Sequence, residues 1–305
     1  MILESFWSWE SARVSSLTLD SLVRKAGRLL AIPRVVGEIL RLLNDANSRQ
    51  ADIAALLAQD PALVAIVLRL ANSPAFAPAR TVDSVDRAIM LLGRDHLRRL
   101  VVAGAVTQAS ERLPMQSLLP LEVFWRHSSY CAVIARLLAE RKSPDLVGTV
   151  FLGGLLHDLG QLVLFSQAPE EAHAAFLRSL EHPDALSPEA AEREELGFDH
   201  AQLGAALAER WGLPDVLCAC LGYHHAPLQA PEAFRVPVGF VHLANSASHL
   251  AELDSRDWQD APPTEPAVLK SLDIDSDLIL ELLNEAQYQV LAVEALRNPR
   301  LSDDG

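Results

Sequence analysis

The sequence predicts an all-helical protein with two packed lobes, in which an N-terminal helical lobe lies against a second helical lobe. Half of the 305 residues are hydrophobic but only 6% are aromatic, a balance that favours Leu- and Ala-rich helices over strands. Apolar residues recur with helical spacing along most of the chain. No segment of convincing length alternates between apolar and polar residues, as a half-buried strand would.

Helix start signals place the first elements. Asp52 precedes an apolar helical segment at residues 53–58. Asp60 and Pro61 then supply the cap and the first residue of a helix that runs to Ala71.

The next helices are bounded in the same way. Ser84 caps a predicted helix at residues 85–92, and Gly93 ends it before a further helix at about residues 95–110. Near the C-terminus, residues 278–296 have the pattern of one long amphipathic helix.

Two breaks divide the chain into three parts. Proline residues discourage a continuous helix through 113–120, and residues 255–266 have the composition of a surface loop. We therefore predict an N-terminal lobe at residues 16–110, a second lobe at 119–252, and an acidic loop with a C-terminal helix at 253–305.

The charge of the chain argues against nucleic acid as a partner. The net charge is -14, whereas proteins that bind the phosphate backbone usually carry a basic face. Four basic and thirteen acidic residues lie from His249 onward, so the C-terminal part is the most acidic. DNA binding is therefore not expected.

The cysteines and the N-terminal residues predict the cellular compartment. Cys131, Cys218 and Cys220 are an odd number with no pairing pattern, which favours a reducing cytoplasm. The first residues have neither the basic start nor the apolar core of a signal peptide. No run of eighteen apolar residues predicts a membrane span.

Five histidines and one aspartate form the candidate functional site. They are His127, His157, Asp158, His200, His224 and His225. Imidazole nitrogen and carboxylate oxygen together suit iron, manganese, nickel or zinc. His157 and Asp158 follow an apolar run at residues 151–156, where charged groups rarely occur without a partner.

The segments around these residues resemble the HD superfamily of metal-dependent phosphohydrolases, and more narrowly its HDOD branch of bacterial signalling output domains. The motifs that contain the candidate ligands are residues 124–128, 155–160, 199–200 and 223–225. Further similar segments are residues 59–63, 68–73, 88–93 and 205–214. The resemblance covers about residues 29–250.

The resemblance assigns ligands to two ion positions. The first uses the His157–Asp158 pair, the earlier His127 and a late aspartate. The second uses the later histidines, His200, His224 and His225. Iron, manganese, nickel and zinc are the metals implied, and a site without metal stays open.

This chain departs from the family pattern at two positions. The late aspartate falls on Asn245, whose neutral amide oxygen holds a cation more weakly than a carboxylate. Many active members carry a phosphate-binding lysine at the position of Gln161. The Gly-Tyr-Pro stretch of the cyclic di-GMP phosphodiesterases has no match.

Several of the candidate ligands also have an interpretation that requires no metal. The His157–Asp158 pair can be a hydrogen-bonded link between two helices. His224 and His225 end an apolar helix, where an imidazolium interacts favourably with the helix dipole. His242, set between apolar residues, is interpreted as a core histidine rather than a ligand.

The resemblance and the two departures favour a non-catalytic or weakly catalytic regulatory or scaffold module in bacterial signal transduction. Its expected partners are proteins of a signalling pathway. Two alternatives stay open. One is a metal-dependent phosphohydrolase of a nucleotide or cyclic dinucleotide, with Asp158 as the catalytic residue. The other is a receptor that binds a nucleotide second messenger without hydrolysing it.

Overall fold

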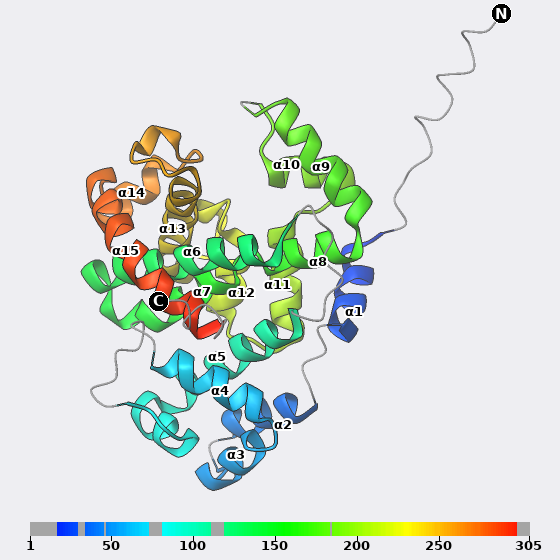
Figure 1. The fold of residues 1–305 in the computed structure, drawn as a ribbon. Helices are drawn as coiled ribbons and strands as arrows, with labels where there is room; N and C mark the ends of the chain where they lie inside the picture. The colour runs from blue at the N-terminus through cyan, green and yellow to red at the C-terminus, as the bar shows by residue number, and fades with distance from the viewer. Residues whose placement is uncertain are drawn as a thin grey trace, which may run out of the picture.

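The computed structural model describes residues 17–29, 34–45, 47–72, 81–110, 119–183 and 185–297. Every regular element in these ranges is a helix, so the predicted all-helical class is confirmed. The helices form a smaller lower group and a larger upper group (Figure 1).

The lower group begins at the second helix. It contains α2 (Arg34–Asn44), α3 (Gln50–Leu57), α4 (Pro61–Ala71) and the first part of α5 (Val85–Ser110). Asp60 caps α4 by accepting a hydrogen bond from the Leu63 amide at 3.0 Å. Ser84 caps α5 through the amide of Arg87 at 3.3 Å. Both predicted helix starts are therefore confirmed.

Gly93 divides α5 into two segments, as predicted. Its φ of 76° and ψ of 171° lie outside the helical region and are readily adopted only by glycine. The second segment, after Gly93, is buried along most of its length and packs against the upper group at α7.

The upper group is built around two mostly buried helices, α6 and α7. It contains α1 (Leu19–Leu29), α6 (Leu121–Lys142), α7 (Val147–Leu156), α8 (Leu159–Gln167), α9 (Pro169–Glu181), α10 (Pro188–Leu196), α11 (His200–Arg210), α12 (Asp215–Tyr223), α13 (Arg235–Leu253), α14 (Pro266–Leu272) and α15 (Ser276–Arg297). Short 3-10 turns lie at Pro144–Leu146, Pro227–Gln229, Glu232–Phe234 and Trp258–Asp260. α6 packs against α7, α13 and α15, and most of its side chains are buried.

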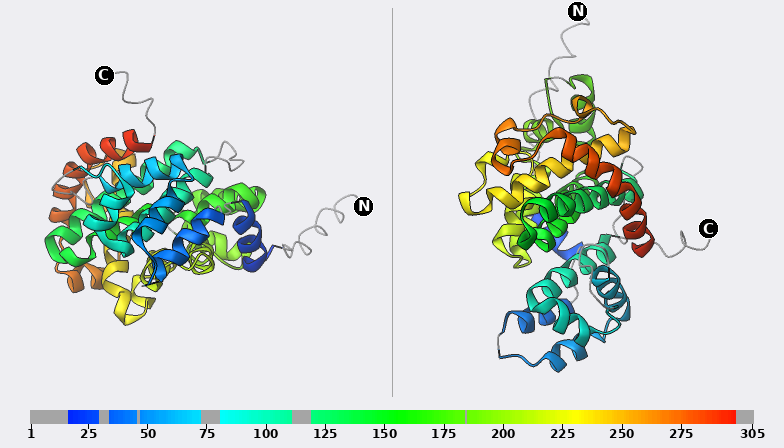
Figure 2. Two further views of the ribbon diagram at one scale, coloured as in Figure 1. Left: turned by 90° about the horizontal axis from the view of Figure 1, so that it is seen from below. Right: turned by 90° about the vertical axis from the view of Figure 1, so that its left-hand side faces the viewer.

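The first helix lies apart from those that follow it. α1 packs against α8 and α11 of the upper group. Figure 1 shows it beside these helices, and Figure 2 shows the same ribbon from two further sides. The chain then crosses to the lower group at α2 and returns through α5. The predicted break at 113–120 falls largely outside the described residues.

Two glycines allow helices to touch backbone to backbone. A methyl group at Gly154 of α7 would lie 2.8 Å from the Ala132 amide nitrogen of α6. One at Gly160 of α8 would lie 1.9 Å from the His200 carbonyl oxygen of α11. These distances are too short for any side chain, so both helix contacts require glycine.

The C-terminal part of the chain packs against α6. The predicted loop at 255–266 contains a 3-10 turn and leads into α14, a helix that the sequence pattern did not reveal. α15 confirms the predicted long helix, and its Glu281 carboxylate lies 3.5 Å from the Arg141 guanidinium of α6. Asp273 similarly pairs with Lys142 at 2.9 Å.

Among the described residues, one segment has the length and hydropathy of a membrane span, residues 144–167, which comprise a 3-10 turn, α7 and α8. Of its apolar window, 83% is buried inside the fold. The segment is interrupted at His157 and Asp158, where α7 ends and α8 begins.

The Gly160 contact gives the first prediction. Replacing Gly160 with alanine should lower the free energy of unfolding by roughly 1–3 kcal/mol or more, because the new methyl group meets backbone that cannot move independently. Gly37→Ala is the matched control, since a methyl group at this helical glycine meets nothing within 4 Å. The control should stabilise the protein by about 0.5–1 kcal/mol. Urea unfolding of the two variants measures both effects, and equal stability would contradict the described contact.

Candidate metal centre

The candidate ligands lie mostly where helices begin or end. Asp158 links α7 to α8, directly after His157 at the end of α7. His200 is the first residue of α11, and His224 follows the last residue of α12. His127 and Asn245 come instead from the interiors of α6 and α13. Helix packing therefore brings together residues that are far apart in the sequence.

The Asp158 carboxylate is the centre of the cluster, and the residue is only 7% exposed. Its Oδ2 lies 3.2 Å from His157 Nε2 and 3.8 Å from His127 Nε2. Its Oδ1 lies 3.4 Å from the Nε2 atoms of both His200 and His224. The two oxygens of one carboxylate thus face two separate pairs of imidazoles.

The remaining two candidates lie at opposite edges of the cluster. The Nε2 atom of His225 is 2.9 Å from that of His200. The side-chain oxygen of Asn245 is 2.8 Å from His127 Nε2. The structure therefore brings all seven residues singled out in the sequence into one site.

Backbone carbonyls fix the orientation of two histidines. His157 Nδ1 donates to the Gly154 carbonyl and His224 Nδ1 donates to the Leu221 carbonyl, both at 2.8 Å. A carbonyl can only accept a hydrogen bond, so each Nδ1 carries a proton, and in the neutral form of either ring Nε2 presents a lone pair. Both Nε2 atoms are buried and have no hydrogen-bond partner.

A carboxylate fixes the orientation of His200. The Glu192 carboxylate of α10 accepts from both the Nδ1 and the backbone amide of His200, each at 2.7 Å. Asp199, the preceding residue, caps α11 through a capping box with Gln202, which fixes the helix start that presents His200.

A second carboxylate holds His127. Its Nδ1 lies 3.1 Å from the Glu252 carboxylate of α13, which also accepts from His249 Nδ1 at 3.2 Å. Four histidines thus have Nδ1 held by an acceptor. In three of them Nε2 faces Asp158, whereas His127 Nε2 lies 2.8 Å from the Asn245 oxygen and 3.8 Å from Asp158. An ordered set of lone pairs facing one carboxylate is the arrangement that metal ligation needs.

The residues fit a bound cation. In neutral imidazoles the Nε2 lone pairs of His157 and His224 would face the Asp158 oxygens, and lone pairs and anionic oxygens repel. A cation among them turns this repulsion into attraction and satisfies the two unpaired nitrogens. The 2.9 Å between His200 and His225 suits two nitrogens on one ion, because metal–nitrogen bonds of about 2.1 Å put neighbouring ligands roughly 3 Å apart.

Charges and hydrogen bonds among these buried groups also shift their pKa values. Burial lowers the pKa of His157, but the charge of Asp158 and the hydrogen bonds to Asp158 and Cys131 together hold this pKa well above its usual range. Burial also lowers the pKa of His200, but Glu192 and Asp158 together raise it well above its usual range. Burial raises the pKa of Asp158, yet His157 and the other imidazoles bring it well below its usual value. The site therefore stabilises positive charge beside an ionised Asp158.

Sequence reasoning missed the carboxylates behind the histidines, Glu192 and Glu252, and also His249. The spacing of Glu252 from Asn245, two helical turns, was the only local signal for it. The interpretation of His242 is confirmed. Its Nδ1 donates to the His224 carbonyl at 2.7 Å and its Nε2 accepts from the Glu265 amide at 3.3 Å, so both ring nitrogens are satisfied.

Burial lowers the pKa of His224 to about 4, which predicts a pH dependence of stability. The unfolded chain binds this proton near pH 6.5, so acidification from pH 6.5 to 4 favours the unfolded state. In metal-free protein the free energy of unfolding should fall by roughly 3 kcal/mol over this range because of His224 alone. The raised pKa values of His157 and His200 affect stability only above pH 6.5.

The measurement compares the wild type with His224→Gln by urea unfolding across that range. As the pH falls, the free energy of unfolding should decrease more in the wild type than in the variant. A constant difference would show that His224 is not buried as described.

Solved structures of similar proteins share this fold. An HDOD domain protein of unknown function from Geobacter sulfurreducens is 27% identical, with 92% of this chain and 99% of that chain covered and a TM-score of 0.66. A candidate phosphohydrolase from Shewanella amazonensis SB2B is 26% identical, with 91% and 98% covered and a TM-score of 0.70. An uncharacterized protein of Treponema pallidum (strain Nichols) is 29% identical over 218 residues, which are 70% of this chain but only 41% of that protein.

The family comparison agrees with the resemblance seen in the motifs. The HDOD domain matches residues 29–227, which include the lower group from α2 onward and six of the seven site residues. This match spans more than half of the sequence. The chain belongs to the HDOD domain family.

Proposed function

We propose that this protein is an HDOD regulatory module of a bacterial signalling pathway, whose buried cluster holds a transition-metal ion but hydrolyses phosphodiesters weakly or not at all. One observation carries the proposal. The imidazoles converge on Asp158 as metal ligation requires. However, neutral amides, Asn245 and Gln161, occupy the two positions where active family members carry an aspartate and a lysine.

The ligands that would hold an ion divide between the two oxygens of Asp158. His127 and His157 face Oδ2, and His200 and His224 face Oδ1, with His225 beside His200. Imidazole-rich sets with one carboxylate suit iron, manganese, nickel or zinc better than magnesium or calcium. When bound, such an ion supplies positive charge that polarises a phosphoryl oxygen.

Asn245 weakens the His127 side of the site. Its amide lies 2.8 Å from His127 Nε2, at the edge of the cluster where a carboxylate would add a second anionic ligand. A neutral amide oxygen contributes less to cation binding and cannot bridge two ions with comparable strength. We expect the change to lower affinity mainly on this side, since His200 and His224 face the other oxygen of Asp158.

Gln161 removes positive charge from the surroundings of the site. It lies one turn into α8 and lines a small hollow with Glu192 and apolar side chains such as Phe165 and Phe176. No lysine or arginine is among the described residues that line this hollow. A phosphate there would meet a carboxylate without a balancing cation, which disfavours anionic substrates.

Regulation through protein partners accords with these features. Metal occupancy would tie together α6, α7, α11 and α12, so the ion can stabilise one packing of the helices that a partner recognises. The acidic face of α15 is one candidate contact, although Glu281 and Glu285 already lie near Arg141.

The activity test supplies cyclic di-GMP, cyclic di-AMP and guanosine tetraphosphate together with manganese, iron or magnesium. We expect no physiological turnover, because removal of one charged stabiliser commonly costs about 10²- to 10³-fold in rate and here two are altered. Hydrolysis of order one per second that disappears in Asp158→Ala would make the phosphohydrolase alternative correct. Saturable nucleotide binding without product would favour the receptor alternative.

The double variant Asn245→Asp/Gln161→Lys is the matching gain-of-function test. Restoring both charges should raise any residual hydrolysis by at least about 10²-fold. Asp158→Ala in the same background should abolish the gain. A double variant with unchanged rates would mean that these two positions do not limit activity.

Metal retention tests the ligand set directly. Asn245→Asp should retain zinc or manganese longer during dialysis against a mild chelator, because it adds an anionic oxygen beside His127. Asn284→Asp adds the same charge on the exposed face of α15 and should not change retention. Asp158→Asn should lose the metal fastest. Equal retention by Asn245→Asp and Asn284→Asp would place residue 245 outside the metal site.

A further inference from the structure

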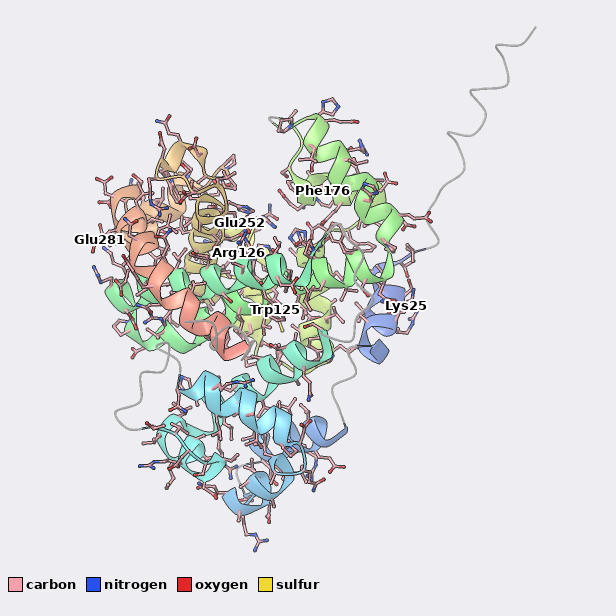
Figure 3. The ribbon with its side chains drawn as sticks, in the orientation of Figure 1. Lys25, Trp125, Arg126, Phe176, Glu252 and Glu281 are labelled. Carbon is pink, nitrogen blue, oxygen red and sulfur yellow. The ribbon has the colours of Figure 1, made fainter. Side chains whose placement is uncertain are left out.

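One face of α13 presents three polar side chains to the His127 side of the cluster. Asn245, His249 and Glu252 occur at positions i, i+4 and i+7, which share a helix face. Only Asn245 belongs to the family's ligand pattern. Figure 3 labels Glu252 near the end of α13, where this helix passes beside α6.

Glu252 is the anion nearest His127 on this face. Its carboxylate accepts from His127 Nδ1 at 3.1 Å and from His249 Nδ1 at 3.2 Å. The side chain of Glu252 is 25% exposed, whereas that of His127 is 9% exposed. The carboxylate therefore lies just outside the buried cluster, with His127 between it and Asp158.

We propose that Glu252 is a positioning residue that supplies, through His127, the negative charge that Asn245 does not supply at the metal. This inference rests on the proposed metal-binding function. A carboxylate bonded to Nδ1–H fixes the imidazole tautomer, points Nε2 at the metal and raises its basicity. In this arrangement the negative charge on this side lies behind His127 rather than at the ligand position of Asn245.

The opposite side of the cluster contains the same arrangement. Glu192 accepts from His200 Nδ1 at 2.7 Å, and His200 Nε2 faces Asp158 Oδ1. The two histidines between them, His157 and His224, are held by carbonyls instead. Each oxygen of Asp158 therefore faces one imidazole backed by a carboxylate and one backed by a neutral carbonyl.

A different use of the same residues is a separate ion held by His127, His249 and Glu252, whose ligand atoms lie within 4.8 Å of one another. The contacts favour the positioning role. These three groups already satisfy one another by hydrogen bonds, whereas the unpaired buried Nε2 atoms belong to His157 and His224. An ion on His127 Nδ1 would also turn its Nε2–H inward and remove one ligand from the inner site.

The experiment measures zinc and cobalt affinity by competition with a chromophoric chelator, together with the cobalt absorption spectrum. Glu252→Gln keeps the size and an acceptor oxygen but removes the charge. It should weaken binding about 10- to 100-fold and shift the cobalt bands, while urea unfolding of the metal-free protein changes little. Adding Asn245→Asp to Glu252→Gln should restore the affinity, because the charge returns to the ligand position.

Two controls complete the design. Glu232→Gln removes one exposed negative charge elsewhere and should bind metal as the wild type does. His249→Ala leaves the bond between His127 and Glu252 and should weaken binding less than threefold.

The outcomes separate this inference from the proposed function. A wild type that binds neither metal would overturn both. A wild type that binds metal while Glu252→Gln binds equally well would overturn the role of Glu252 alone. A loss in His249→Ala as large as in Glu252→Gln would also overturn it, because the metal would then lie on the outer residues. Failure of Asn245→Asp to rescue Glu252→Gln would also overturn it, because a charge at residue 245 would then not replace that of Glu252.

Discussion

The buried charge of Asp158 is the constraint on which the site depends. A carboxylate at this depth is costly unless positive charge lies beside it. No lysine or arginine is among the described partners of Asp158, whose neighbours are imidazoles. Imidazoles can meet the charge as protonated rings or as ligands of a shared metal ion. The unpaired nitrogens of His157 and His224 make the second arrangement the more complete one.

Close helix packing makes this convergence geometrically feasible. Gly154 brings α7 against α6 and so places His157 near His127, and Gly160 brings α8 against α11 and so places Asp158 near His200. Both glycines lie within one turn of the His157–Asp158 junction. The same few residues therefore determine the packing of four helices and the position of the central carboxylate. A substitution that loosens either contact would affect folding and ligand geometry together.

The helix ends could be predicted from the sequence, because they depend on neighbouring residues. The partners of the histidines and the packing of α1 depend on long-range contacts and could not. The caps at Asp60 and Ser84 and the break at Gly93 follow from side-chain and backbone preferences, and the structure has all three. The ordered motifs named the residues that converge, because a family pattern carries long-range information that periodicity lacks. Glu192 and Glu252 could not be recognised in this way, since their roles depend on which histidine the fold places beside them. The packing of α1 on α8 and α11 likewise has no local signal.

Holding an ion and using it for phosphoryl transfer place different demands on such a site. Ion binding depends mainly on the inner imidazoles and Asp158, and on the carboxylates that fix the imidazole tautomers. Phosphoryl transfer also needs charge arranged around the substrate, outside the ligand set. Gln161 lowers the charge outside the ligand set and Asn245 lowers it at one ligand position, whereas His157, His200 and His224 stay in place. Under the proposed function, an ion would therefore act as a cross-link among the helices, and the surface of the protein would differ between the bound and the free state.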